Sequence, residues 1–389
     1  MEKHEEKACL CALNKIFGFS PKIGLALISH TGSAADVFRL GSREMDEVLG
    51  PHNKYQGKLT WKAVEEAAEE LSGLEGRDIR FIGWTEDDYP DMLLECEDAP
   101  IGLYVRSKTP MSELWKPKKR IAIVGTRDIS AYGREWCTRT VDGLSRSPEK
   151  PVIVSGLALG TDFCAHKTAL DSGLETIGVM ATGPETIYPY RHREFAEKLC
   201  NTPGCALVTD YPPGTAPLAI HFLRRNRIIA GLSDATILIE SKIKGGGMMT
   251  CRLAFSYSRD VYALPGRVDD LRSQGCNSLI RNKIAEPFIS AEDIAESLGL
   301  KHIGGAGRRG VSEVIMESYR SELAADKLGM AVTAATIISK ERGITIEELA
   351  AAIGCSYGMT ADIISMLETD GFISVDLLQR CFIMMEKFR

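Results

Sequence analysis

Residues 121–162 read IAIVGTRDIS AYGREWCTRT VDGLSRSPEK PVIVSGLALG TD. Two short apolar runs, Ile121–Val124 and Val152–Val154, flank a helical stretch over Gly133–Leu144. A strand that is apolar on both faces is typical of a parallel sheet covered by helices on both sides. This stretch therefore predicts a strand–helix–strand unit of a parallel sheet.

The alternation of apolar runs and helical stretches continues through residues 77–300. The further apolar runs are Thr176–Met180, Ala206–Val208, Ala235–Glu240 and Val261–Leu264, and the further helical stretches include Asp162–Asp171 and Arg191–Cys200. This pattern predicts an α/β fold with a Rossmann-like, doubly wound and mainly parallel sheet. At about 150 residues per domain, a chain of 389 residues has room for smaller units on either side.

Residues 1–76 form the first of these expected units. Leu10, Leu13 and Ile16 recur at helical spacing, and the segment Gly18–Gly24 interrupts the pattern. The pattern resembles a SAM-like or helix-hairpin-helix domain. Such hairpins bind phosphate through main-chain N–H groups when a Gly-x-Gly sequence lets the chain approach closely. Because Ser20 stands at the second glycine position, simple helix packing is favoured here over phosphate contact.

The C-terminal part begins with a glycine-rich stretch, and we expect a linker over residues 301–325. Residues 326–389 show helical patterns followed by two short strands, which predicts a winged-helix domain. From Gly343 to Gln379 the sequence contains acidic residues but no Lys or Arg. A recognition helix without cations cannot neutralise phosphates, so this domain is expected to bind protein or its own chain. That argues against a transcription factor.

Composition limits the class of nucleic-acid partner. With 47 Lys and Arg against 53 Asp and Glu, the net charge is -6, so any nucleic-acid site must be local. Eleven scattered cysteines fit structural thiols in a reducing compartment, and their spacing gives no metal site. The charged segment Met1–Lys7 precedes no long apolar stretch. We therefore expect a cytoplasmic protein without a membrane span.

Glycine turns follow several of the predicted strands. Val124-Gly-Thr-Arg127, Ser155–Asp162 and Gly245–Thr250 would all lie at the carboxyl edge of the sheet, where open parallel sheets bind ligands. The turns match neither the dinucleotide fingerprint nor the Walker loop. ATP hydrolysis and hydride transfer therefore lose support, and no cofactor is expected.

A cluster of cations follows at Arg224-Arg-Asn-Arg227. Guanidinium groups bind phosphate oxygens and stack on bases, and an amide between them can contact a base edge. The spacing of Asn226 and Arg227 suits joint contact to one nucleotide. For Arg224 and Arg225, the alternative to ligand contact is that they are solvated charges at the start of a helix. Arg127 and Arg227 are both expected in exposed strand-end loops, so that alanine at either position weakens binding of the polyanion and leaves the fold intact.

These motifs together resemble the DNA-processing protein A (DprA/Smf) family. The resemblance rests on the segments above, on Tyr188-Pro189, on Phe222–Ser233 and on Pro265-Gly266, and it spans roughly residues 81–290. It implies a non-enzymatic protein of natural transformation that binds and protects single-stranded DNA. It also implies loading of the RecA recombinase onto that DNA, and a homodimer.

The expected DNA contacts lie in the strand-end turns and the arginine cluster. They are Gly125, Thr126, Arg127, Ser130, Ser155, Gly156, Ala158, Gly160, Asp162, Arg224, Arg225, Asn226, Arg227, Gly246 and Thr250.

Two other functions remain as alternatives. A phosphoribohydrolase-like Rossmann enzyme also uses a Pro-Gly-Gly loop, but here Arg267 follows Pro265-Gly266. His166 shares a helix face with Asp162, yet no nucleophile is paired with them, so we expect His166 to be a buried, helix-positioning residue. A nucleotide-sensing regulator would need a basic recognition helix.

Overall fold

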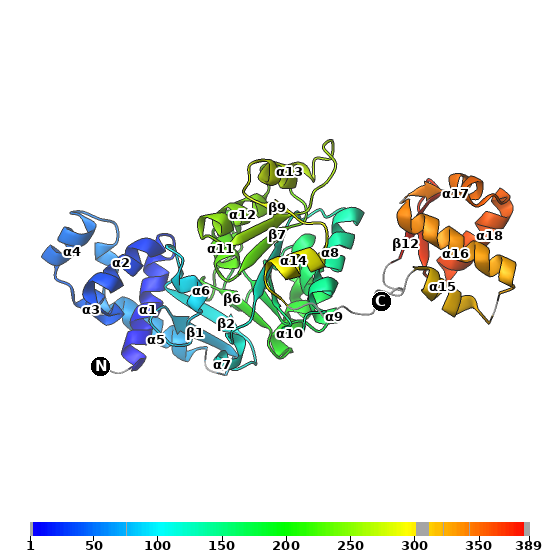
Figure 1. Ribbon diagram of the computed structural model, residues 1–389. Coiled ribbons are helices and arrows are strands. Elements are labelled where there is room, and N and C mark those ends of the chain that lie inside the picture. Colours follow the sequence, from blue (N-terminus) through cyan, green and yellow to red (C-terminus); the bar gives the residue numbers. More distant parts are fainter. Residues whose placement is uncertain (1–2, 75, 301–310, 322, 342, 385–389) are drawn as a thin grey trace. The chain divides into compact units, whose positions relative to one another are not determined.

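The computed structural model describes residues 3–74, 76–300, 311–321, 323–341 and 343–384. The chain divides into two compact units, residues 1–302 and residues 303–389, and each is described by itself (Figure 1).

Five helices open the first unit and gather at one end of it, beside strands β1 and β2 (Figure 1). They are α1 (Lys3–Phe17), α2 (Pro21–Thr31), α3 (Ala34–Arg39), α4 (Ser42–Leu49) and α5 (Trp61–Ser72), with a 3-10 turn η1 (Gln56–Lys58). Leu10, Leu13 and Phe17 of α1 pack with Phe81 and Tyr104 of the adjoining strands, so these helices share a core with the edge of the sheet.

The hairpin between α1 and α2 is tight. Pro21 occupies the first turn of α2, where its missing N–H costs no hydrogen bond. The Ser20 N–H donates to the Phe17 carbonyl oxygen at 2.6 Å, so this turn uses one of its own main-chain donors.

A nine-stranded sheet forms the centre of the unit. Its strands are β1 (Ile79–Gly83), β2 (Gly102–Arg106), β3 (Arg120–Val124), β4 (Val152–Ser155), β5 (Thr176–Val179), β6 (Ala206–Thr209), β7 (Ala235–Leu238), β8 (Asp260–Ala263) and β9 (Glu286–Pro287). Their order is β1-β2-β6-β5-β4-β3-β7-β8-β9. The ladders from β6 to β9 are parallel, and only the β1–β2 and β2–β6 ladders are antiparallel.

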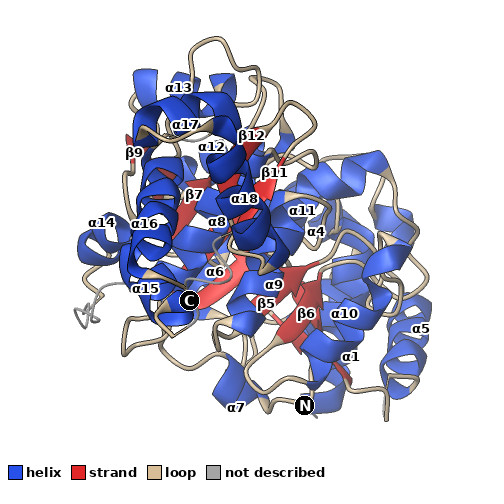
Figure 2. Ribbon diagram, turned by 90° about the vertical axis from the view of Figure 1, so that its right-hand side faces the viewer, coloured by secondary structure: helices blue, strands red, loops and turns tan. Residues whose placement is uncertain are grey.

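Helices cover both faces of this sheet (Figure 2). The helices after β1 are α6 (Asp91–Leu94), α7 (Met111–Leu114), α8 (Ala131–Leu144), α9 (Thr161–Asp171), η2 (Tyr190–His192), α10 (Arg193–Asn201), α11 (Ala219–Gly231), α12 (Gly246–Ser256), α13 (Gln274–Arg281) and α14 (Ala291–Ser297). In β3, Ile121 and Ile123 pack in the core formed with α8, α9 and α14, whereas Ala122 and Val124 pack in the core formed with α11, α12 and α13. The continuous apolar strand is thus explained by burial on both sides.

The expected α/β class and largely parallel sheet are confirmed. All six predicted strands and the three predicted helices of this region are present within a few residues of the expected bounds. The two antiparallel strands β1 and β2 extend the sheet toward the N-terminal helices.

The second unit contains helices and a small sheet. Its elements are α15 (Val311–Tyr319), α16 (Ala325–Lys340), β10 (Ile344–Thr345), α17 (Ile346–Ile353), α18 (Tyr357–Thr369), β11 (Ile373–Val375) and β12 (Arg380–Ile383), and the antiparallel sheet has the order β10-β12-β11.

The first part of the expected linker, residues 301–310, lies outside the described residues. The expectation is wrong for residues 311–319, because Ile315 and Tyr319 of α15 are buried in the core of this unit.

Within the described ranges, no single helix is long and apolar enough to cross a membrane. The pair α17 and α18 passes that test together by length and composition, with a bend of 113° between them.

Candidate nucleic-acid interface

A groove of about 780 Å³ opens at the carboxyl ends of β3 and β7. These two strands are neighbours in the sheet, although three other strands, β4, β5 and β6, lie between them in sequence, so the order of the strands reverses there. Ligands of open parallel sheets bind at such a switch point. The groove is lined by Val124, Gly125, Thr126, Arg127, Ala158, Asp162, Tyr188, Pro217, Ala219, Phe222, Leu223, Arg225, Asn226, Ile229, Ser241, Lys242, Lys244, Gly245, Gly246, Gly247 and Thr250.

Arg225 is the most unusual of these residues. It is only 3% exposed, and its Nε and Nη1 atoms have no hydrogen-bond partner among the described residues. Burial lowers the pKa of Arg225 to about 10, the nearby Asp162 carboxylate opposes that shift, and the like charge of Arg127 adds to it. A buried cation without partners is costly unless a ligand neutralises it. An anion in the groove would supply hydrogen-bond acceptors to Arg225.

Gly156 makes the position of Arg225 possible. A Cβ atom at Gly156 would lie 1.6 Å from Arg225 Nη1, so only glycine leaves room for the guanidinium group. Gly156 itself does not line the groove. Its contribution is space for the arginine rather than a main-chain N–H group for phosphate.

An aromatic surface lies beside the two arginines. The Arg127 guanidinium carbon lies 5.2 Å from the centroid of the Phe222 ring, and Tyr188 packs edge-on against that ring at 5.4 Å. Tyr188 is 46% exposed. Aromatic faces next to cations suit unpaired bases. Both aromatic residues lie in the segments that carry the family resemblance, and neither was predicted from sequence as a DNA contact.

The first turn of α12 forms another wall. Gly245 caps this helix without a side-chain hydrogen bond, and Asn226 Nδ2 donates to the Gly246 carbonyl oxygen at 3.4 Å. Lys242 and Lys244 are exposed in the preceding loop and were also missed from sequence. Helix N-termini favour anions. Together with Arg127 and Arg225, this wall makes the lining cationic, with Asp162 as its acidic member.

The N-terminus of α8 is already occupied. The Glu240 carboxylate accepts hydrogen bonds from the Ser130 N–H at 2.9 Å and from the Ser130 hydroxyl, which also caps α8 at the Gly133 N–H. A Cβ at Gly133 would lie 2.5 Å from that carboxylate. Ser130 therefore bonds within the protein and does not line the groove, in contrast to the expectation from sequence.

Arg227 points into the protein. It lies within helix α11, 7% exposed, and forms an ion pair with the buried Asp210. Burial opposes its charge, yet the neighbouring Asp210 and Asp98 carboxylates raise the pKa of Arg227. The expectation of an exposed strand-end loop is wrong for Arg227, because an α-helix turns by about 100° per residue and adjacent arginines face different directions.

Arg224 also lies outside the groove lining. Its Nη1 donates to the Phe19 carbonyl oxygen at 2.9 Å and its Nη2 donates to the Gly18 carbonyl oxygen, while its guanidinium carbon lies 4.2 Å from the centroid of the Phe19 ring. The residue thus fastens α11 to the α1–α2 hairpin.

The remaining strand-end residues shape the groove from behind. The Ser155 hydroxyl donates to the Ile123 carbonyl oxygen at 2.6 Å in the buried interior. Gly160 has φ 75°, and a Cβ there would lie 2.4 Å from the Thr126 carbonyl oxygen. Position 160 requires glycine because of this backbone conformation and because the loop that carries Thr126 approaches closely.

The residues His166, Pro265 and Gly266 of the enzymatic alternative do not line the groove. His166 is fully buried, its Nδ1 lies 2.7 Å from the Thr176 hydroxyl, and burial lowers the pKa of His166 to about 3. The expected burial of His166 is confirmed. Gly266 bonds through its main chain with the Asn277 side chain, and neither Pro265 nor Gly266 lines the groove.

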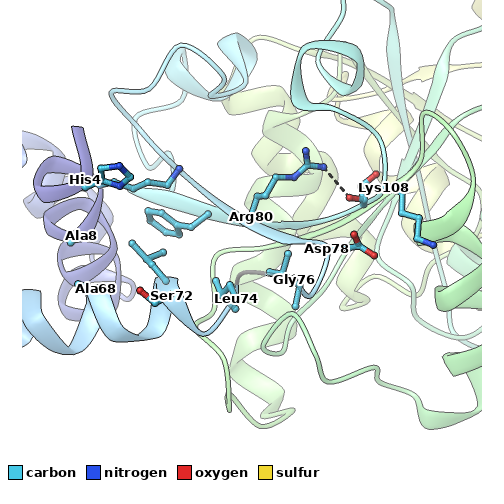
Figure 3. Close-up of a pocket in the computed structure, with 14 residues that line it drawn as sticks. His4, Ala8, Ala68, Ser72, Leu74, Gly76, Asp78, Arg80 and Lys108 are labelled. Carbon is cyan, nitrogen blue, oxygen red and sulfur yellow. Dashed lines mark hydrogen bonds between the residues drawn. The ribbon is translucent and has the colours of Figure 1, made fainter. Parts of the chain in front are cut away.

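Another cavity, of about 790 Å³, lies between α1, α5 and β1 (Figure 3). Figure 3 shows the Arg80 side chain extending toward the segment that carries Lys108, and Arg80 Nη2 donates to the Ser107 carbonyl oxygen at 2.9 Å. Lys7 pairs with Glu86 at 3.1 Å. Because Arg80 and Lys7 already have protein partners, whereas Arg225 lacks them at Nε and Nη1, the groove at β3 and β7 is the better candidate for an anion site.

Comparisons with known proteins show which proteins this chain resembles. The family model described as "DNA recombination-mediator protein A" matches residues 80–299. The DNA processing protein DprA of Streptococcus pneumoniae is 37% identical over 209 residues, which cover 54% of this chain and 71% of that protein. A putative DNA processing protein DprA of Mycobacterium tuberculosis is 31% identical over 359 residues, covering 89% and 86%. The X-ray structure of DNA processing protein A from S. pneumoniae superposes with a TM-score of 0.62 at 30% identity, covering 73% of this chain and 95% of that one.

Proposed function

Because the chain belongs to the DNA recombination-mediator protein A family, we propose that it binds single-stranded DNA in the groove at β3 and β7. Relatives carry the name DNA processing protein, and processing of DNA is the broader role that we assign to this chain.

One observation carries the proposal: the unpaired, buried guanidinium group of Arg225 at the floor of a cationic groove. A phosphodiester oxygen supplies the hydrogen-bond acceptors that Arg225 lacks within the protein, and its charge adds to that of Asp162. Arg127, Lys242, Lys244 and the first turn of α12 would neutralise the adjoining backbone.

The aromatic side chains support a single strand rather than a duplex. Tyr188 and Phe222 offer ring surfaces for stacking, and only unpaired bases expose faces to receive them. The net charge of -6 also disfavours broad electrostatic coating of duplex DNA.

A direct comparison of ligands tests this function. Fluorescence anisotropy with a labelled oligo-dT, a duplex of equal length and a nucleoside monophosphate is expected to give binding of the single strand at least about a hundredfold tighter than of the duplex. Equal affinity for the two DNA forms would refute the proposal. Release of free base from the monophosphate would favour the phosphoribohydrolase-like enzyme instead.

The wider role follows from the family resemblance. We propose that the protein acts in natural transformation as a non-enzymatic homodimer, protects incoming single strands and loads RecA recombinase onto them. Eleven free cysteines support a reducing, cytoplasmic location. We further propose the domain division into residues 1–76, 77–300 and a C-terminal winged helix, the last supported by the order α16, β10, α17, α18, β11, β12.

Gly156→Ala is expected to weaken single-strand binding by at least about tenfold without any change of charge. The new methyl group would occupy the space of Arg225 Nη1 and displace the guanidinium group from the groove. Anisotropy titration with oligo-dT measures the effect, and thermal unfolding reports on folding. Gly57→Ala is the control, since nothing lies within 4 Å of that position. Wild-type affinity of a folded Gly156→Ala protein would mean that Arg225 is not the phosphate anchor.

A further inference from the structure

Phe19 is an exposed aromatic residue held in a fixed position. It is 57% exposed in the turn between α1 and α2, and Arg224 covers one region of its ring at 4.2 Å. The same arginine donates to the carbonyl oxygens of Gly18 and Phe19. The neighbouring His221 ring lies 5.8 Å away. An apolar ring kept in solvent by several contacts is positioned for a ligand rather than for the core.

A smaller cavity of about 390 Å³ adjoins this ring. Its lining includes Phe19, Lys22, Leu223, Arg224 and Met249. Leu223 also lines the larger groove, so the two cavities meet on the same side of α11. Met249 belongs to the first turn of α12, the helix whose N-terminus forms a wall of that groove. A strand that leaves the groove over Leu223 therefore arrives at Phe19.

The chemistry of the smaller cavity suits a base more than a further phosphate. Phe19, Leu223 and Met249 are all exposed apolar side chains. The charged lining residues already have partners within the protein: Asp98 accepts a hydrogen bond from the Tyr257 hydroxyl at 2.6 Å, and the cations Lys22, Arg224 and Arg227 bond to Glu97, to main-chain carbonyl oxygens and to Asp210. Stacking on an aromatic ring tolerates any base, which suits a protein that takes up DNA of arbitrary sequence.

We propose that Phe19 forms a second base-stacking subsite, which continues the single-stranded DNA path from the groove onto the N-terminal helical hairpin. The inference rests on the proposed function, because the occupant is the same strand. Arg224 acts here as a positioning residue that presents the ring, and the hairpin contributes an aromatic face in place of main-chain phosphate contacts.

Oligonucleotide length separates the subsite from the groove. Oligo-dT of about 4 nucleotides would fill the groove alone, whereas oligo-dT of about 12 would also reach Phe19. Phe19→Leu keeps an apolar side chain of similar size but removes the ring. It is expected to weaken binding of the long oligonucleotide about tenfold and to leave the short one unchanged. Phe19→Trp keeps an aromatic ring and is expected to bind the long oligonucleotide with wild-type affinity. The fluorescence of the new tryptophan is expected to be quenched by the long oligonucleotide and not by the short one.

Phe255→Leu is the matched control, because Phe255 is similarly exposed on α12 and lines neither cavity. If wild-type protein binds both lengths and Phe19→Leu binds the long oligonucleotide equally well, the subsite is refuted and the groove stands. An equal loss for both lengths would assign Phe19 a merely structural role and also overturn the subsite. Failure of wild-type protein to bind either length would refute the proposed function itself.

Discussion

Arg225→Met should reduce single-strand affinity by about 3 kcal/mol, or roughly a hundredfold, while the free protein stays folded. The loss arises because Arg225 would be the buried donor to a phosphate. The stability of the free protein should change little, because methionine removes a buried cation that lacks hydrogen-bond partners at Nε and Nη1 but also removes the countercharge of the nearby Asp162. Anisotropy titrations over a range of salt concentrations should also give a slope of log affinity against log salt that is shallower by about 0.7.

Arg43→Met is the control for net charge, since Arg43 is a highly exposed residue of α4 and lies outside the groove lining. A folded Arg225→Met protein with wild-type affinity and an unchanged salt slope would exclude Arg225 from DNA contact. A marked fall in melting temperature would instead show that Arg225 stabilises the empty protein.

Arg227→Met should have its largest effect on folding. The substitution leaves Asp210 buried without its ion-pair partner, which costs about 3–5 kcal/mol of unfolding free energy. Urea denaturation measures this loss. Weaker DNA binding is expected only as a consequence of the unfolded fraction.

The double variant Arg227→Met with Asp210→Asn is expected to recover most of that stability, because the unpaired charge is gone. If the single variant were as stable as wild-type protein and yet bound DNA poorly, the original expectation from sequence would stand, with Arg227 as a DNA contact.

The parallel part of the sheet was predictable because a strand that is buried on both faces is apolar at nearly every position in the sequence. Ile121–Val124 is apolar at every position, and each side chain packs in one of the two cores. The linker was less predictable, because α15 has a short helical pattern next to a glycine-rich stretch. Its helix is stabilised by packing of Ile315 and Tyr319 against residues far along the chain.

The candidate site was predictable in its location but not in its detail. Gly125, Thr126, Arg127, Asp162, Arg225 and Asn226 do line the groove, as do Ala158, Gly246 and Thr250. The bond between Ser130 and Glu240 joins residues 110 positions apart, and no local pattern indicates it. Adjacent residues of an α-helix point in directions about 100° apart. A prediction that places Arg224–Arg227 inside a helix, where they lie in α11, would therefore have put Arg225 and Arg227 on different sides.

Glu240 closes a place where other ligands of this architecture bind. In dinucleotide-binding folds the pyrophosphate rests at the N-terminus of the helix after the first parallel strand, and here the Glu240 carboxylate bonds to Ser130 at that position. We therefore expect nucleotide di- and triphosphates to compete poorly with the single strand proposed for the neighbouring groove.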